Sequence, residues 1–132
     1  MKIIIALLVF SVIIIFHELG HFLLAKRAGV TVTEFSLGMG PRILSFQAGG
    51  TRYSWKLLPF GGSCMMLGED EGDEGEGTFG SKSVWARMSI IVAGPLFNFL
   101  LAFLMYAFVG ILLRMGQSNP PREYKKLVET AE

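Results

Sequence analysis

Three residues in the stretch FHELGHF, at positions 16–22, carry side chains that can do chemistry. On a helix, His17 and His21 lie four residues apart on one face, close enough for their imidazole rings to bind a single metal ion. Glu18 lies about 100° round the helix from His17, beside that face, which suits a general base acting on a metal-bound water. Neutral imidazole is a good zinc ligand, and zinc lowers the pKa of bound water toward about 7. The spacing therefore predicts a zinc centre with a catalytic carboxylate.

These polar residues lie near the end of an apolar run, residues 3–25, that is long enough to cross a bilayer. The simplest alternative is a helix whose polar side chains satisfy one another or face a neighbouring helix. However, a charged residue at the centre of a membrane costs roughly 2.5–3.5 kcal/mol, and a complete H-E-x-x-H pattern is rare by chance. At about 1.5 Å per residue, His17 lies about 21 Å along the helix from Ile3 and about 12 Å from Ala25. We therefore expect the metal below the membrane surface at the Ala25 end.

The composition indicates a membrane protein. Of the 132 residues, 52% are hydrophobic, and the mean hydropathy of +0.50 is too high for a typical soluble domain of this size. The net charge of +1 gives no sign of nucleic-acid binding. Two apolar segments, residues 3–25 and 90–113, each have the roughly 20 residues that a span requires. We expect an α-helical membrane protein with two transmembrane helices, within residues 1–25 and 88–114, joined by a cytoplasmic loop that contains a membrane-associated β-hairpin.

Basic residues set the expected orientation. Lys26, Arg27 and Arg87 stand beside the membrane ends of the connecting segment, whereas the N-terminus offers only Lys2. By the positive-inside rule the connecting segment is cytoplasmic and both termini are outside, which makes residues 115–132 an extracytoplasmic tail. Basic residues near and within that tail weaken the bias.

The β-hairpin is expected in residues 26–68. Two β-prone runs, Ile43–Gln47 and Thr51–Leu58, are separated by a Gly-Gly pair, where a positive φ angle has no steric cost. In the second run apolar and polar residues alternate, so one face of that strand is largely apolar and carries Tyr53 and Trp55.

Two further features follow the hairpin runs. Residues 63–67, after a second Gly-Gly pair, are expected to add another strand or to dip into the membrane surface. Residues 69–87 are expected to form a flexible, solvated loop, because the chain there is acidic and glycine-rich up to Thr78. Such a composition cannot bury enough apolar area to order itself.

The sequence resembles the site-2 protease family of intramembrane zinc metalloproteases, most closely its regulator of sigma-E protease branch. Three stretches carry the resemblance in the family's order: FHELGHFLLAKRAGVTVTEFSLGMGPRI resembles the first transmembrane helix and its exit, GTRYSWKLLPFGGSCMMLGEDE the membrane-associated β-hairpin region, and FGSKSVWARMSIIVAGPLFNFLLAF the start and body of the second helix. The resemblance implies a protease of the bacterial inner (plasma) membrane, with its active site toward the cytoplasm. His17 and His21 would be zinc ligands and Glu18 the catalytic base.

The resemblance also implies the partners. Substrates would be single-pass membrane proteins, such as anti-sigma factors or remnant signal peptides, cut within the bilayer after a first protease has removed their outer part. The family's third zinc ligand is an aspartate in an Asp-Gly motif on a later helix, and no such motif occurs before Glu132. We therefore expect an N-terminal portion of a longer enzyme, or a truncated homologue, that is inactive by itself. Where relatives have an aromatic residue and a lysine after the second Gly-Gly pair, this sequence has Ser63, Cys64 and Met65.

Other residues have two readings each. Asn98 would cost a few kcal/mol if unpaired in lipid, so we expect it to contact the substrate or active site, or to hydrogen-bond between helices. Tyr53 and Trp55 are candidate substrate-binding residues, because the hairpin could capture an unwound substrate as an added strand. The alternative is that the hairpin plugs the cytoplasmic mouth of the site. Cys64 is expected to be a small apolar filler.

Two other functions stay open from the sequence. A non-catalytic homologue could hold transmembrane partners, and a metal transporter could pass ions between buried histidines. The intact Glu18 argues against the first, since binding alone would not need it. A transporter would be expected to place further polar ligands along a path, and the second span offers little beyond Asn98.

Overall fold

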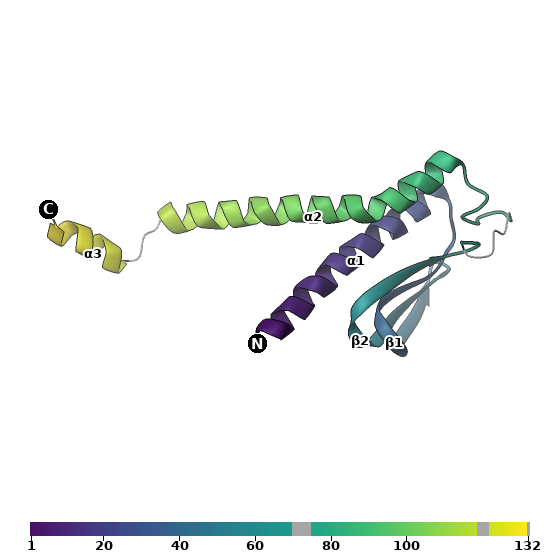
Figure 1. The fold of residues 1–132 in the computed structure, drawn as a ribbon, viewed down its shortest axis with the longest axis horizontal. Helices are drawn as coiled ribbons and strands as arrows, with labels where there is room; N and C mark the ends of the chain where they lie inside the picture. Colours follow the sequence, from purple (N-terminus) through teal and green to yellow (C-terminus); the bar gives the residue numbers. More distant parts are fainter. Residues whose placement is uncertain (70–74, 119–121, 132) are drawn as a thin grey trace. The chain divides into compact units, whose positions relative to one another are not determined.

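The computed structural model describes residues 1–69, 75–118 and 122–131. In chain order its elements are α1 (Lys2–Ala28), β1 (Val32–Ala48), β2 (Thr51–Met66), α2 (Val84–Ser118) and α3 (Arg122–Ala131) (Figure 1). The chain divides into two compact units, residues 1–99 and 100–132, and the division falls inside α2. All the candidate site residues belong to the first unit.

Both long helices are apolar along most of their length. Over their most apolar windows α1 and α2 have mean hydropathies of 2.6 and 2.4, and few of the side chains there are buried. By length and composition they could therefore be membrane spans. Each helix extends past the segment expected from the sequence: α1 ends at Gly29, whose φ of 77° is left-handed, and α2 begins after Ser83, whose hydroxyl accepts a hydrogen bond from the Ala86 N–H.

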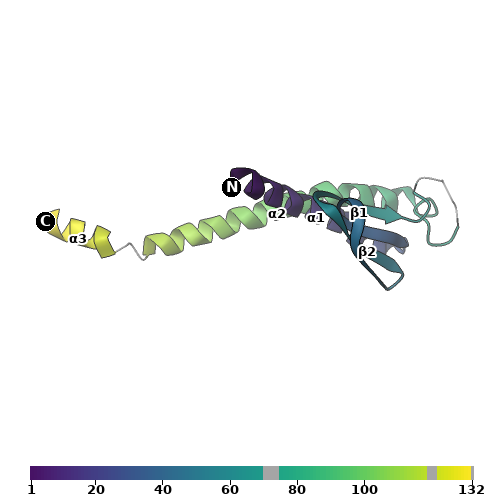
Figure 2. The same cartoon turned by 90° about the horizontal axis from the view of Figure 1, so that it is seen from below.

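The two strands pair antiparallel but form more than a simple hairpin. Three ladders connect them: residues 42–48 of β1 pair with 51–56 of β2 across the Gly49–Gly50 turn, residues 32–37 pair with 62–66, and residues 34–37 pair also with 52–55. In the last ladder the residue numbers rise together, so these two segments run in the same direction. Each strand therefore bends back on itself, and Figures 1 and 2 show the resulting curled ribbon beside α1.

Glycines allow these bends. Gly38 in β1 and Gly61 in β2 have φ angles of 85° and 82°, which side chains other than glycine adopt only with strain. At Gly61 a Cβ atom would also lie 2.7 Å from Met39 Cγ, so the crossing chains leave no room for one. The predicted strands Ile43–Gln47 and Thr51–Leu58 are thus too short. The expected break at Gly61 is a bend inside β2, and most of the third run, residues 63–66, forms the last part of that strand.

The curled sheet has a polar face and an apolar face. On the polar face Glu34, which is 6% exposed, accepts hydrogen bonds from Arg42 Nε at 3.2 Å and from Arg42 Nη2 at 2.6 Å. On the apolar face the ring of Phe22, from α1, packs against Phe35 at 5.3 Å and Tyr53 at 6.1 Å between ring centroids. The aromatic contacts fix the sheet to α1, close to the two histidines in the sequence.

The Glu34–Arg42 pair predicts that acid loosens the sheet. The hydrogen bonds from Arg42 hold the pKa of the Glu34 carboxyl below its ordinary value of 4.5. Because the folded-state pKa is lowered, the pair stabilises the sheet fully above about pH 4.5 and ceases to do so as the pH falls through the lowered value. Limited proteolysis should cut β1 and β2 faster in acid, and Arg42→Ala should show this faster cutting already at neutral pH. Equal cutting of Arg42→Ala and wild type at pH 7 would contradict the assignment.

The described residues between β2 and α2, 67–69 and 75–83, are hydrogen-bonded to one another and to the start of β1, in a region where a flexible loop was expected at residues 69–87. Thr78 is 1% exposed, and the Phe79 N–H donates to Leu67 O at 2.8 Å. The Thr31 N–H donates to Gly77 O at 2.8 Å, which ties the segment to the entry of β1. The central part of the acidic run, residues 70–74, lies outside the described residues. A small core of Ala25, Val30, Val32 and Ile90 lies where these segments meet α1 and α2.

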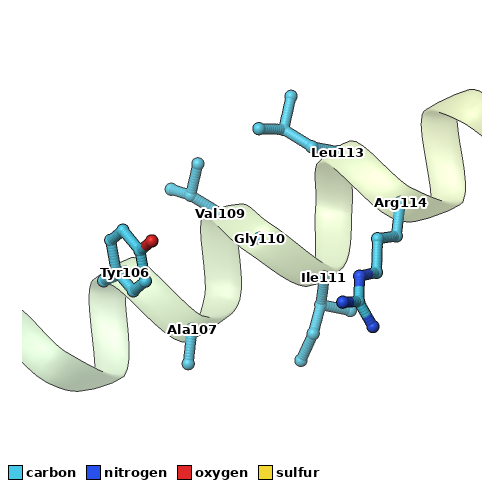
Figure 3. A pocket seen from close by; sticks show the side chains of 7 residues that line it. All are labelled: Tyr106, Ala107, Val109, Gly110, Ile111, Leu113 and Arg114. Atoms are coloured by element: carbon cyan, nitrogen blue, oxygen red, sulfur yellow. The ribbon is translucent and has the colours of Figure 1, made fainter.

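The second unit contains the end of α2 and the helix α3. The expected tail, residues 115–132, is therefore helical in part, with its described residues 122–131 in α3. Figure 3 shows the side chains from Tyr106 to Arg114 that line a hollow along α2. All seven residues that line it lie on this one helix, so it is the groove between successive turns rather than a ligand pocket.

Candidate metal centre

The two histidines of α1 lie together as the sequence predicts. His17 and His21 are both half-buried, and their ring centroids are 4.8 Å apart with the rings nearly perpendicular at 80°. A spacing of four residues on one helix places them in consecutive turns of the same face. Both rings are turned toward the first half of α2, which supplies their contacts.

Each imidazole is held through its Nδ1 atom. His21 Nδ1 lies 2.7 Å from the backbone carbonyl oxygen of Ile90. A carbonyl oxygen only accepts hydrogen bonds, so His21 carries its proton on Nδ1, and Nε2 keeps a free lone pair in the neutral ring. His17 Nδ1 lies 3.2 Å from the Asn98 side-chain amide. In both rings Nε2 is therefore the nitrogen that these contacts leave available.

The two Nε2 atoms converge on the space beside Gly94. A Cβ atom on this buried glycine would lie 2.5 Å from His21 Nε2 and 2.7 Å from His17 Nε2. The absence of a side chain at Gly94 thus leaves a gap that both nitrogens face. Two imidazole nitrogens around one gap, with their other nitrogens hydrogen-bonded, are a donor set that zinc accepts. These residues fit two of the ligands of a zinc ion.

Glu18 lies on the side of α1 that faces the end of β2. Its Cγ atom would be 3.5 Å from a Cβ atom on Gly62, and the carboxylate is half-buried. No hydrogen bond or ion pair to another described residue engages it. A carboxylate with unoccupied lone pairs is able to accept a proton. Its role as the general base of the reaction stays a prediction.

Cys64, in β2, is not poised as a thiolate. Burial, together with the nearby negative charges of Glu18 and Glu69, raises the pKa of its thiol to about 12. A thiol with this pKa is protonated at neutral pH, whereas a zinc ligand must be a thiolate. This agrees with its prediction as a small apolar filler.

The described residues supply two protein ligands but not three. Among them no three His, Cys, Asp or Glu side chains lie close enough to hold one metal ion. Catalytic zinc normally has three protein ligands and an open position. Where a third ligand comes from stays a prediction.

The close approach of α1 and α2 depends on small residues. Gly20 is buried, and a Cβ there would clash with the carbonyl group of Ala93 and lie 3.0 Å from the ring of Phe97. The lack of a side chain at Gly20 therefore permits the close contact between the two helices. Nearby, Pro95 has no N–H to donate to the carbonyl of Ile91, so the helix ladder is interrupted beside the site.

The other predicted site residues lie in different places. The structure brings Asn98 to His17, as already described. Tyr53 stacks on Phe46 at 5.2 Å and packs against α1, whereas Trp55 is 58% exposed on the apolar face of the sheet. No hydrogen bond or ring contact joins Tyr53 or Trp55 to the histidines among the described residues, and their part in substrate binding stays a prediction.

Two features of the site were not assigned from the sequence. The backbone carbonyl of Ile90 gives no sequence signal, since any residue could supply it. The second feature is Gly94, which has no side chain to suggest a role. Its spacing of four residues from both Ile90 and Asn98 places the three on one face of α2, which is a signal that could have marked it.

Comparisons with known proteins show the family of the chain. The model of Peptidase family M50 matches residues 5–131. A protein of Clostridium acetobutylicum named "Putative zinc metalloprotease" is 45% identical over 110 residues, which are 83% of this chain and 32% of the relative. One of Fusobacterium nucleatum with the same description is 42% identical over 105 residues, 80% of this chain and 31% of the relative. The chain thus spans about a third of the length of these relatives. With its paired histidines and adjacent glutamate, the chain belongs to Peptidase family M50, the site-2 protease family.

Proposed function

We propose that the protein is a zinc-dependent endopeptidase that cleaves membrane-spanning segments of single-pass membrane proteins. The observation that carries the proposal is the convergence of His17 Nε2 and His21 Nε2 on the gap at Gly94. Family membership supports the metalloprotease chemistry. The partnerless carboxylate of Glu18 favours a hydrolase over a protein that only binds or transports, since neither of those needs a base.

In the proposed reaction, three residues of α1 have distinct roles. When bound, zinc supplies Lewis acidity, which polarises a peptide carbonyl and lowers the pKa of water. His17 and His21 hold the metal. Glu18 removes a proton from the attacking water and can return it to the leaving amine. The half-buried position of these side chains limits the access of bulk water to them.

The surfaces around the site support the proposed substrate class. Both long helices expose apolar side chains along their length, so a lipid bilayer is their proposed surrounding. Residues 44–48 of β1 form one side of the sheet, pairing only with β2 among the described residues, and Leu44 and Phe46 are 63% and 66% exposed there. An unwound substrate could add to this edge as a further strand, with Trp55 on the adjacent strand. Anti-sigma factors and remnant signal peptides are the kinds of substrate proposed.

The proposed location is the bacterial inner membrane, with the sheet on the cytoplasmic side. Lys26 and Arg27 at the end of α1 and Arg87 near the start of α2 support this orientation. The exposed Glu76 offers a test. In a Cys64→Ser background, a cysteine replacing Glu76 should be protected from an impermeant thiol reagent in intact cells and should react after lysis. Reaction in intact cells would reverse the orientation.

We further propose that a third protein ligand comes from outside the described residues, and that the 132-residue chain alone does not cleave. The function itself is tested on the full-length natural protein, reconstituted in liposomes with a single-pass substrate. Cleavage within the membrane segment should be lost on removal of zinc by a chelator and restored by added zinc. Cleavage that persists in metal-free protein would reject the proposal.

A further inference from the structure

Residues 90, 94 and 98 form a stripe on one face of α2. They are spaced by four residues, so they lie one above another along the helix. His17 and His21, also four residues apart, face this stripe: His21 Nδ1 contacts Ile90 O at 2.7 Å, and His17 Nδ1 contacts the Asn98 amide at 3.2 Å. Gly94 lies between the two contacts and faces both Nε2 atoms. The stripe therefore presents a polar group, a gap and a second polar group to the two rings.

The orientation of the Asn98 amide decides which nitrogen of His17 is free. With Nδ2 toward His17, the amide donates to Nδ1, and the proton of the neutral ring must be on Nε2, where it blocks metal binding. With Oδ1 toward His17, the ring donates from Nδ1, and Nε2 keeps its lone pair. The two amide orientations have almost the same shape, and the choice between them is set by hydrogen bonding.

Burial alone does not choose between the two orientations. As placed, Asn98 Oδ1 is buried and has no hydrogen-bond partner among the described residues. A turned amide would put Nδ2 in that position, so one end lacks a partner in either case. The choice instead comes from His17 and His21 together: only Oδ1 toward His17 gives both rings a free Nε2 at the Gly94 gap.

We infer that Asn98 is a positioning residue, which accepts a hydrogen bond from His17 Nδ1 through its Oδ1 atom and so fixes the His17 tautomer that binds zinc. The inference rests on the proposed function, because it assumes a metal at the histidines. It assigns to a side chain at His17 the task that the Ile90 carbonyl performs at His21. Asn98 acts through His17 and need not touch the substrate.

Two substitutions separate this role from the opposite one. Asn98→Asp keeps an acceptor oxygen and removes the donor, so it should preserve the Nδ1–H tautomer of His17 and keep zinc affinity close to that of the wild type. Asn98→Leu has a similar size but no acceptor, so His17 should lose its tautomer preference and zinc should bind about 10- to 100-fold more weakly. A donor role for Asn98 predicts instead that Asp is as harmful as Leu.

The tautomers can be measured directly because the chain contains only two histidines. The full chain, purified without a histidine tag, is labelled with ¹⁵N-histidine and studied metal-free in lipid nanodiscs at about pH 8.5, where imidazole is ordinarily neutral. Nitrogen NMR distinguishes protonated from unprotonated ring nitrogens. Zinc affinity is measured separately by competition with a chromophoric chelator.

We expect protons on Nδ1 of both rings in the wild type, and in Asn98→Leu a change at His17 with His21 unaltered. If Leu disturbs both rings, the fold has changed, and Asn98→Asp decides the question. A proton on Nε2 of His17 in the wild type, or equal loss of zinc affinity in Asp and Leu, would overturn the inference. If the tautomers are as expected but the full-length natural protein binds no zinc, the proposed function is wrong while the tautomer assignment stands.

Discussion

Glu18→Gln should lower the rate of substrate cleavage about 10²- to 10⁴-fold while zinc content stays near that of the wild type. Glutamine has the shape of glutamate but cannot accept a proton, and Glu18 makes no hydrogen bond to the described residues whose loss could disturb the fold. His17 and His21 keep their contacts with α2. The measurements are the rate of cleavage of a single-pass substrate and the zinc content of the same preparation of the full-length natural protein.

His21→Ala is the matched comparison for this result. It removes a metal ligand, so metal and activity should both fall. The zinc content of the two variants thereby distinguishes a general base from a metal ligand: it should stay near normal in Glu18→Gln and fall in His21→Ala. If Glu18→Gln cleaves at a near wild-type rate, Glu18 is not the base and the catalytic interpretation of the FHELGHF stretch is wrong.

Gly94→Ala should weaken zinc binding about 100-fold or more and should abolish cleavage with it. The new Cβ would lie 2.5 Å from His21 Nε2 and 2.7 Å from His17 Nε2, in the space that the two nitrogens face. Either the methyl group occupies the place of the metal, or α1 and α2 move apart and the rings lose their partners on α2. Zinc affinity and cleavage are measured on the purified variant.

Gly110→Ala is the matched control, since it changes another glycine of the same helix. A Cβ at Gly110 would meet no atom within 4 Å, and alanine favours a helix over glycine. This variant should bind zinc and cleave like the wild type. Wild-type zinc affinity in Gly94→Ala would show that the metal does not lie where the two Nε2 atoms converge.

Local patterns in the sequence predicted the helical part of the site well. The four-residue spacing of His17 and His21 is decided within one helix, so the sequence alone placed the rings on a common face. The expected role of Asn98 was limited to a contact with the substrate or active site, or a hydrogen bond between helices, because an unpaired amide is costly in lipid.

The sheet was predicted only in part, because its pairing is not local. The Gly49–Gly50 turn allowed the hairpin on either side of it to be predicted, since the turn fixes the register of the residues next to it. The pairing of residues 32–37 with two different segments of β2 depends on bends at Gly38 and Gly61, and no pattern of alternation shows which distant segment a bent strand will meet. The burial of Glu34 was missed for the same reason, since its partner Arg42 approaches only in the curled sheet.

X-ray absorption at the zinc edge of the full-length natural protein tests the central claim most directly. If His17 and His21 hold the metal, the spectrum should contain the scattering pattern of two imidazole rings with nitrogen and oxygen neighbours at about 2.0–2.2 Å. That imidazole pattern should disappear in a His17→Ala, His21→Ala double variant. A spectrum that is the same in the double variant, with zinc still bound, would show that the metal lies elsewhere and would contradict the account.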